Sequence, residues 1–166
     1  MSAEAHQELG NRPQPTGVIK LPSLGLEFVL VDQLDAGATH RNGSSLPGEP
    51  GTCAIEAHRT GPFRRLGELQ PGDYVYISVT TGGDDLVHRY VITVEPMVVP
   101  EYDPLLATWR MELFDRLGIP GPDPKISSYR RLMLSTCSAR DGEADPEDNS
   151  HRIVVLADLH AEEPVQ

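Results

Sequence analysis

The fold class is indicated by two segments in the middle of the chain, YVYISVT (74–80) and VHRYVITV (87–94). Both are rich in β-branched and aromatic residues, which pack well on a pleated sheet, and the turn-forming stretch TGGDDL (81–86) separates them. Outward from this pair, segments of the same kind recur: VIKLPSLG (18–25), LEFVLVD (26–32), CAIEAH (53–58), RLMLST (131–136) and RIVVLADL (152–159). Seven or eight short strands separated by turn signals predict an all-β sandwich or barrel.

Two stretches depart from this strand pattern. In RTGPFRRLGELQPGD (59–73) we expect a short helical turn followed by a Pro-Gly-Asp turn. In PLLATWRMELFDRLGIPGP (104–122), leucines and Trp109 recur at three- and four-residue steps, which predicts a helix. This helix would lie in the long connection between a strand that ends near Val99 and one that starts near Arg130.

Length and composition narrow the class of protein. A chain of 166 residues fits one domain, and we expect a flexible lead-in (1–17), one folded domain (18–160) and a short C-terminal tail (161–166). A formal net charge of −11 argues against binding to a nucleic-acid backbone. Two cysteines exclude a disulfide-stapled scaffold and a four-cysteine zinc module. The sequence also shows no long apolar run and no signal-peptide pattern.

Three residues at strand ends are candidates for chemistry. Cys137 ends the segment LMLSTC, His58 ends CAIEAH, and Arg152 opens the last strand. A free thiol has a pKa of about 8.5, so a reactive cysteine needs a neighbour such as histidine. A cation can then stabilise the negative charge that develops on a substrate oxygen. The alternative is that Cys137 is a small buried apolar residue and that His58 is an ordinary turn residue.

Four segments, in their order along the chain, resemble the sortase family of transpeptidases. They are PGEPGTCAIEAHRT (47–60), the F…L…L…GDYVYI pattern (63–77), LMLSTC (132–137) and RIVVLADL (152–159). In that family a histidine ends one strand, a Thr-Leu-x-Thr-Cys motif ends the next-to-last strand, and an arginine lies on the final strand. The resemblance is most like class E, the actinobacterial housekeeping branch. It implies a closed eight-stranded β-barrel, with the 104–122 helix inserted before the strand that ends in Cys137.

The resemblance also implies a role for each candidate. Cys137 matches the nucleophile, His58 the general acid, and Arg152 the cation that positions the substrate and stabilises the oxyanion. The family cleaves Leu-Pro-x-Thr-Gly sorting signals (Leu-Ala-x-Thr-Gly in class E) between Thr and Gly, and an amine resolves the thioacyl-enzyme. The implied partners are the sorting-signal peptide of a surface protein and an amine from a cell-wall precursor or a pilin lysine. No metal or other cofactor is expected. The residues expected at the substrate are Ser135, Thr136 and Trp109.

The resemblance further implies a place of action outside the cytoplasm. Sortases are anchored by an N-terminal membrane helix, and the sequence given contains no such segment, so we expect a soluble, monomeric catalytic domain of a membrane-anchored protein. The N-terminal segment lacks the Asp-Pro-aromatic lid motif of pilin-polymerising sortases, which favours surface-protein attachment. Two alternatives stay open: a weakly active or non-catalytic barrel that binds peptides or partner proteins, and a hydrolase that needs no amine acceptor.

Three positions depart from the family pattern close to the candidate site. Met133 stands where the Thr-Leu-x-Thr-Cys motif has its first threonine, so any role of that hydroxyl is lost. Glu56 and Ala57 stand where the family has Ala-Gly before the histidine, and we expect Glu56 to be a solvated carboxylate that points outward. The helix that carries Trp109 either shapes the substrate pocket or only seals the core.

The remaining titratable residues are expected to lie outside the candidate site. Cys53 is interpreted as a core packing residue and His40 as a loop residue. His88 and Arg89 are expected to face solvent. The acidic stretch ARDGEADPEDNS (139–150) has no apolar periodicity and is expected to be a mobile loop. Its carboxylate spacing does not match a calcium-binding EF-hand loop, so a solvated acidic loop is expected there and not a calcium site.

Overall fold

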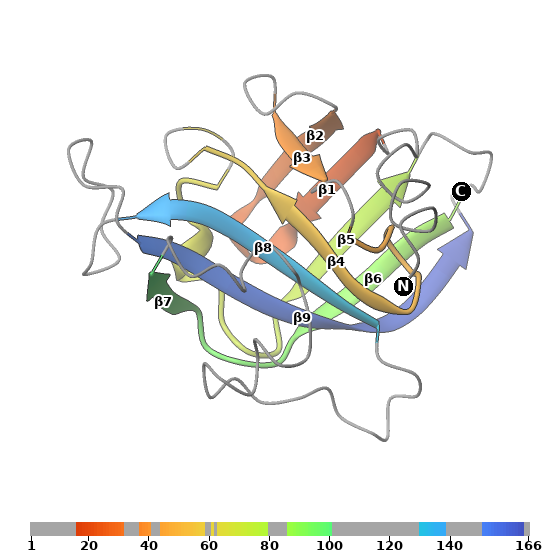
Figure 1. Cartoon of the computed structure of the whole chain (residues 1–166). Helices are drawn as coiled ribbons and strands as arrows, with labels where there is room; N and C mark the ends of the chain where they lie inside the picture. The colour runs from red at the N-terminus through yellow and green to blue at the C-terminus, as the bar shows by residue number, and fades with distance from the viewer. Residues whose placement is uncertain are drawn as a thin grey trace, which may run out of the picture.

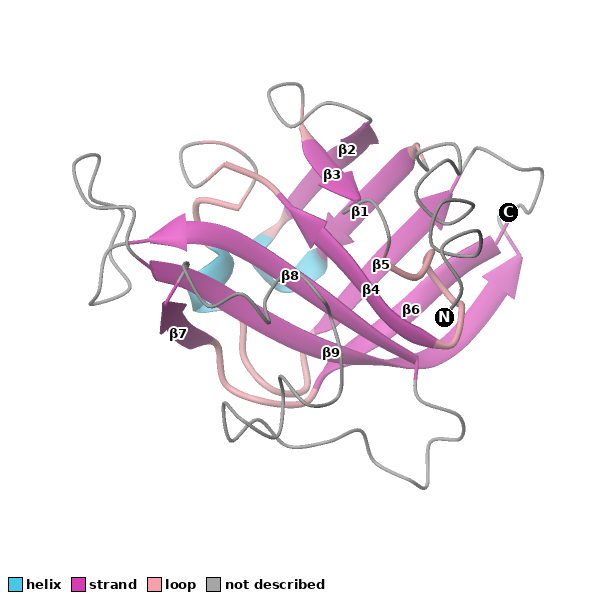
Figure 2. Cartoon of the chain, in the orientation of Figure 1, coloured by secondary structure: helices cyan, strands magenta, loops and turns pink. Residues whose placement is uncertain are grey.

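The computed structural model describes residues 16–31, 37–40, 44–58, 61, 63–79, 86–100, 130–138 and 151–164 (Figure 1). Within these ranges the chain forms nine strands and two short 3-10 turns (Figure 2). The strands are β1 (Gly17–Leu21), β2 (Leu26–Val31), β3 (Ala38–His40), β4 (Gly51–Glu56), β5 (Tyr74–Val79), β6 (Leu86–Ile92), β7 (Met97–Pro100), β8 (Arg130–Ser138) and β9 (His151–Pro164). The turns are η1 (Pro22–Leu24) and η3 (Leu66–Glu68). Across these ranges no helix is long and apolar enough to cross a bilayer.

Eight of the strands close into a barrel, as predicted. Their order around the ring is β6-β5-β1-β2-β3-β4-β8-β9, and β9 pairs back with β6. β7 pairs with the start of β9 and lies beside the ring (Figure 1). Neighbouring strands are antiparallel except for the pairs β2–β3 and β4–β8, which are parallel. Closure removes the open sheet edges that would otherwise expose unpaired backbone groups.

The long strand β9 has two successive partners along one side. Residues 151–154 pair with β7, and residues 157–164 pair with β6 through a register shift between Arg89 and Tyr90. Along its other side, residues 151–158 pair with β8. The strand therefore includes Ala161–Pro164, which the sequence pattern assigned to a tail. These four residues contain no β-branched or aromatic side chain that would have marked them as strand.

Alternate residues of the strands fill the barrel interior. On β4 and β8 these are Cys53, Ile55, Leu132 and Leu134, all of them buried. Cys53 is thus a core residue, as predicted. The predicted helical turn is present as η3, and it closes one side of the core with Phe63, Leu66 and Leu69.

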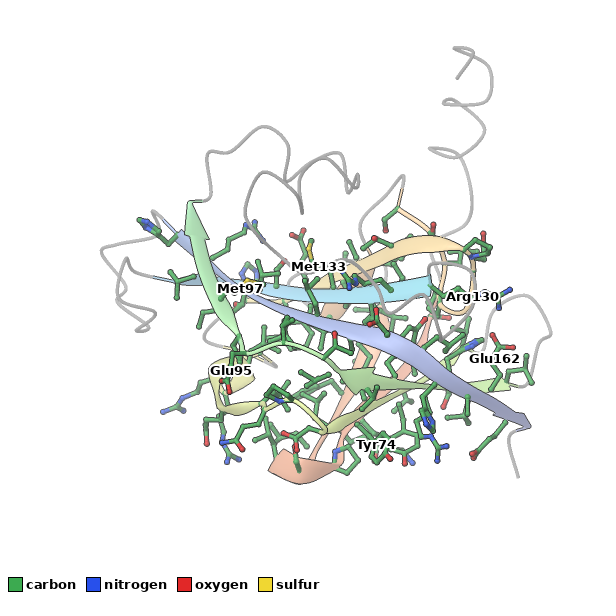
Figure 3. The ribbon with its side chains drawn as sticks, turned by 90° about the horizontal axis from the view of Figure 1, so that it is seen from below. Tyr74, Glu95, Met97, Arg130, Met133 and Glu162 are labelled. Carbon is green, nitrogen blue, oxygen red and sulfur yellow. The ribbon has the colours of Figure 1, made fainter. Side chains whose placement is uncertain are left out.

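The outer face of β4, β8 and β9 is buried as well. Ala54, Met133 and Leu156 lie in register across these three strands, and each is at most 1% exposed. Figure 3 shows Met133 on the side of β8 that faces away from the barrel interior. Burial on both faces explains why RLMLST and RIVVLADL are nearly continuous apolar runs instead of alternating ones. These strands, buried on both faces, each have one end at the candidate site.

Two histidines lie in places that the sequence pattern did not predict. The prediction that His88 faces solvent is wrong, because this residue is only 7% exposed and shares the inward face of β6 with Tyr90 and Ile92. His40 belongs to β3 instead of a loop, and it is buried, with Nε2 2.8 Å from the carbonyl oxygen of Ser45. β3 has only three residues, which is too short for an alternating pattern to show.

Candidate active site at the ends of three strands

Strand register brings the candidate residues to one end of the barrel. Glu56 of β4 is level with Ser135 of the parallel strand β8, and Cys137 of β8 is directly opposite Arg152 of β9. His58 follows Glu56 by two residues. The amide between them donates a hydrogen bond of 3.3 Å to the carbonyl oxygen of Ser135, so β4 stays beside β8 past its own end. In Figure 1 the end of β8 lies next to the start of β9.

Arg152 ties the three strands together through its side chain. Its Nη1 donates to Oε2 of Glu56 at 3.2 Å and to Oγ of Ser135 at 3.3 Å. The side chains of Arg152 and Glu56 are 19% and 11% exposed, so the ion pair is largely shielded from solvent. Hydrogen bonds between ionised groups are stronger than neutral ones, particularly where water is excluded.

The expectation that Glu56 is a solvated carboxylate is therefore wrong. Its side chain does lie on the outer face of β4, but that face is covered where β4, β8 and β9 meet. A buried carboxylate is unfavourable unless a positive group compensates it, and Arg152 supplies that charge. The spacing of Glu56 and His58 indicates that they lie on the same side of the chain, but nothing in the sequence shows that this side is covered or that Arg152 reaches it.

Ser135 and Thr136, predicted to contact substrate, are both buried, at 2% and 1% exposed. Ser135 lies on the outer face with Glu56, where its hydroxyl oxygen accepts the bond from Arg152. Thr136 is the next residue. It is an even number of positions from the core residues Leu132 and Leu134, so it lies on the same face of β8 as they do. Its Oγ1 is buried and finds no hydrogen-bond partner among the residues that the structure describes. Trp109, the third predicted substrate residue, lies outside the described residues, as do the 104–122 helix and the 139–150 stretch.

The two cysteines have different environments in the fold. Cys53 is enclosed in the core, and burial raises the pKa of its thiol well above the ordinary value, with the negative charge of Glu49 adding to the effect. A thiol in that setting stays protonated and unreactive at neutral pH. Cys137 sits one residue before the end of β8, beside the charged residue Arg152. The burial of Cys53 thus argues against it as a nucleophile.

His58 completes the set of predicted catalytic residues. It is exposed, and its carbonyl oxygen accepts a hydrogen bond of 3.0 Å from the amide of Gly61, which begins the turn region before η3. An exposed imidazole beside a strand end can exchange protons with a bound ligand. In the part of the chain that the structure covers, no group of three or more His, Cys, Asp or Glu side chains is arranged to hold a metal ion. The chemistry that these residues offer is acyl transfer through a thiol, an imidazole and a guanidinium.

Comparisons with known proteins agree with this arrangement. The sequence model of the Sortase domain matches residues 19–160. Sortase D from Bacillus subtilis (strain 168) is 32% identical over 74 residues, which are 42% of this chain and 37% of that protein. The match thus spans little more than a third of that curated relative's length.

Solved structures show the same fold. Sortase E from Streptomyces avermitilis has a TM-score of 0.65 at 23% identity, covering 92% of this chain and 91% of that chain. The SrtA sortase from Actinomyces oris has a TM-score of 0.67 at 21% identity, covering 92% and 88%. At these identities the structural likeness establishes the fold alone. The match to the family model, in contrast, includes the segments that carry His58, Cys137 and Arg152. The chain belongs to the sortase family of cysteine transpeptidases.

Proposed function

We propose that this chain is a transpeptidase in which Cys137 is the nucleophile, His58 the general acid and Arg152 the cation at the oxyanion. One observation carries most of the weight. Cys137 and Arg152 are opposite each other in the β8–β9 ladder, at the end of the barrel where His58 follows β4. A thiol, an imidazole and a guanidinium at one end of a rigid barrel meet the requirements for acyl transfer.

In the first half of the proposed reaction a peptide bond is broken. The thiolate of Cys137 attacks the carbonyl carbon of threonine in the sorting signal, and the carbonyl electrons move to oxygen. N–H groups of Arg152 stabilise that oxyanion. As the intermediate collapses, the C–N bond to glycine breaks and the imidazolium of His58 gives its proton to the departing amine. A thioester between the threonine carbonyl and Cys137 remains.

In the second half an amide bond is made. A neutral amine attacks the thioester carbonyl, its surplus proton passes to the imidazole of His58, and Cys137 leaves as a thiolate. One peptide bond has been exchanged for another, so no oxidant, reductant or metal is required. A thioester keeps the acyl group activated, which lets an amine compete with water and gives a reason for cysteine in place of serine.

The substrate is proposed to be a Leu-Pro-x-Thr-Gly or Leu-Ala-x-Thr-Gly sorting signal of a surface protein, as in class E. The amine is proposed to come from a cell-wall precursor or a pilin lysine, and the site of action to be the extracytoplasmic face of the membrane. Because Ser135 and Thr136 are buried, we propose that they act from beneath the peptide, Ser135 by holding Arg152. The segment that carries Trp109 is proposed to form a wall of the groove.

Steady-state transpeptidation tests this proposal. The protein is mixed with each of the two pentapeptide signals, with and without triglycine, and ligated and hydrolysed products are separated by chromatography. We expect a ligated product that depends on triglycine and is lost in Cys137→Ala and His58→Ala. Cleavage at the same rate with and without triglycine, and with no ligated product, would instead identify a hydrolase. A folded protein that yields neither product would identify a non-catalytic barrel.

A further inference from the structure

Glu56 is the departure from the family pattern that the structure places against a catalytic residue. We infer that Glu56 is a positioning residue for Arg152 in the transpeptidation, a role that rests on the function proposed above. It acts by holding one nitrogen of the guanidinium in place and does not itself touch the reacting atoms. The carboxylate is therefore expected to change the rate of the chemical step more than the affinity for the peptide.

The contact is directional. Nη1 of Arg152 donates to Oε2 of Glu56 and to Oγ of Ser135, so one nitrogen is held between oxygens from two different strands. The guanidinium is planar and its N–H groups form a rigid fork. Fixing Nη1 inward at β4 and β8 therefore also fixes the directions of the remaining N–H groups.

An arginine needs this kind of restraint. Its long side chain has several rotatable bonds, and ordering it in one geometry is entropically unfavourable. Ser135 offers an oxygen at 3.3 Å, and Glu56 adds a second oxygen at 3.2 Å in a largely buried setting. The register of β4 with β8 places both acceptors at the same level, so they hold Arg152 jointly.

Glu56 has two effects on Arg152 that oppose each other. Holding the guanidinium accelerates the reaction, because a well-placed donor stabilises the oxyanion. Compensating its positive charge weakens that same stabilisation. Two substitutions separate the effects. Glu56→Gln keeps the length of the side chain and an oxygen acceptor but removes the charge, and Glu56→Asp keeps the charge but withdraws it by one methylene.

The test is to measure kcat and KM for wild type, Glu56→Gln and Glu56→Asp in the triglycine ligation assay. If Glu56 positions Arg152, Glu56→Gln keeps kcat within about threefold and Glu56→Asp loses about tenfold or more, both with little change in KM. In an Arg152→Ala background neither substitution should reduce kcat further, because the residue through which Glu56 acts is gone.

A matched control exists between β8 and β9. Arg131 of β8 and Asp158 of β9 form another buried pair, with Nε 3.1 Å from Oδ1, away from the strand end that holds Cys137. Asp158→Asn breaks a buried ion pair between the same two strands without reaching Arg152. We expect it to lower the melting temperature and to leave the kcat of the folded protein near that of wild type.

The outcomes are distinct. Equal kcat in wild type, Glu56→Gln and Glu56→Asp would overturn the positioning role and leave the proposed function intact. A Glu56→Gln protein more than threefold faster than wild type would also overturn it, because the loss of charge compensation would then outweigh the loss of positioning. Absence of Cys137-dependent product from folded wild type with both peptides would overturn the proposed function itself, and the positioning role with it.

Discussion

Cys137 and Arg152 are direct partners in the antiparallel ladder between β8 and β9. Residues opposite each other in such a ladder have Cα atoms about 4.5–5.5 Å apart, so their separation is set by backbone hydrogen bonds and not by a loop. The same ladder holds Ser135 opposite Val154. Glu56 of β4, which is level with Ser135, contacts the side chain of Arg152. A site built on paired strands is held more rigidly than one built on loops.

Replacing Arg152 should separate charge from geometry. Arg152→Lys keeps a positive charge but has no planar fork, and Arg152→Ala removes both. We expect kcat/KM to fall about 100-fold or more in Arg152→Ala, because a donor to the oxyanion is lost. Arg152→Lys should lie closer to Arg152→Ala than to wild type. Single-turnover kinetics with excess enzyme checks this, and a fully active lysine variant would contradict it.

The same substitution should also affect stability. Without Arg152, the largely buried carboxylate of Glu56 loses a charged partner, at a penalty of about 1–3 kcal/mol in the free energy of unfolding. Combining Arg152→Ala with Glu56→Gln should recover part of that loss, because the amide carries no charge to bury. Urea unfolding of the two single variants and the double variant measures the coupling. Strictly additive losses would show that the pair is not coupled.

The Arg131–Asp158 pair is predicted to be structural. Both side chains are at most 5% exposed, and removal of one partner from a buried ion pair destabilises a protein by about 3–5 kcal/mol. Arg131→Met should therefore be much less stable than wild type. The double variant Arg131→Met/Asp158→Leu should recover most of the loss, because it leaves no unpaired charge. Urea midpoints measure the stability of each variant. A double variant no more stable than Arg131→Met would contradict this account.

Gly48 lies at a crowded turn where only glycine fits. Its φ is +83°, and a Cβ added there would lie 2.5 Å from Cε1 of His88. Gly48→Ala should lower the free energy of unfolding by about 1–3 kcal/mol through strain and displacement of that ring. Gly25 is the matched control, because its φ is +66° and, chain neighbours apart, no described residue has an atom within 4 Å of an added Cβ. Equal losses in the two alanine variants would rule out the clash with His88.

Two core groups should make the fold sensitive to alkaline pH. Burial raises the pKa of the Cys53 thiol and of the Tyr90 hydroxyl from ordinary values of 9.0 and 10.0. Above pH 9.0 the unfolded chain loses the Cys53 proton while the folded chain keeps it. The free energy of unfolding then falls, by about 1.4 kcal/mol per pH unit for each such group. Urea titrations from pH 8 to 11 should show a shallower fall in Cys53→Ala than in wild type. The same slope in both proteins would contradict this prediction.

Much of the barrel was readable from the sequence, because local pattern and fold agree. Segments such as YVYISVT and RIVVLADL have the β-branched content of strands, and the resemblance to the sortase family implied that these strands close into a ring. β3 and the last four residues of β9 were missed for a physical reason. β3 is too short to show a period, and the end of β9 is polar, so pairing with neighbours and not local propensity makes both into strand.

The sequence predicts the members of the candidate site but not their contacts. The identities of His58, Cys137 and Arg152 followed from strand ends and motif order. The pairing of Glu56 with Arg152 depends on burial of the outer face of β4, and an alternating pattern says which residues share a face but not whether that face is covered. His88 is the reverse case. It alternates with Tyr90 and Ile92 in the sequence, which places it on their inward face, and this position outweighs its polarity.

The most direct test of the account is intact-mass analysis of the acyl-enzyme. The protein is incubated without any amine acceptor with Leu-Pro-x-Thr-Gly and, separately, Leu-Ala-x-Thr-Gly peptides, then quenched in acid and weighed beside Cys137→Ala and Cys53→Ala. We predict a mass increase equal to the peptide up to threonine, present in wild type and Cys53→Ala, absent in Cys137→Ala, and discharged by triglycine. An adduct that persists in Cys137→Ala, or no adduct on folded wild type with either peptide, would contradict the central claim.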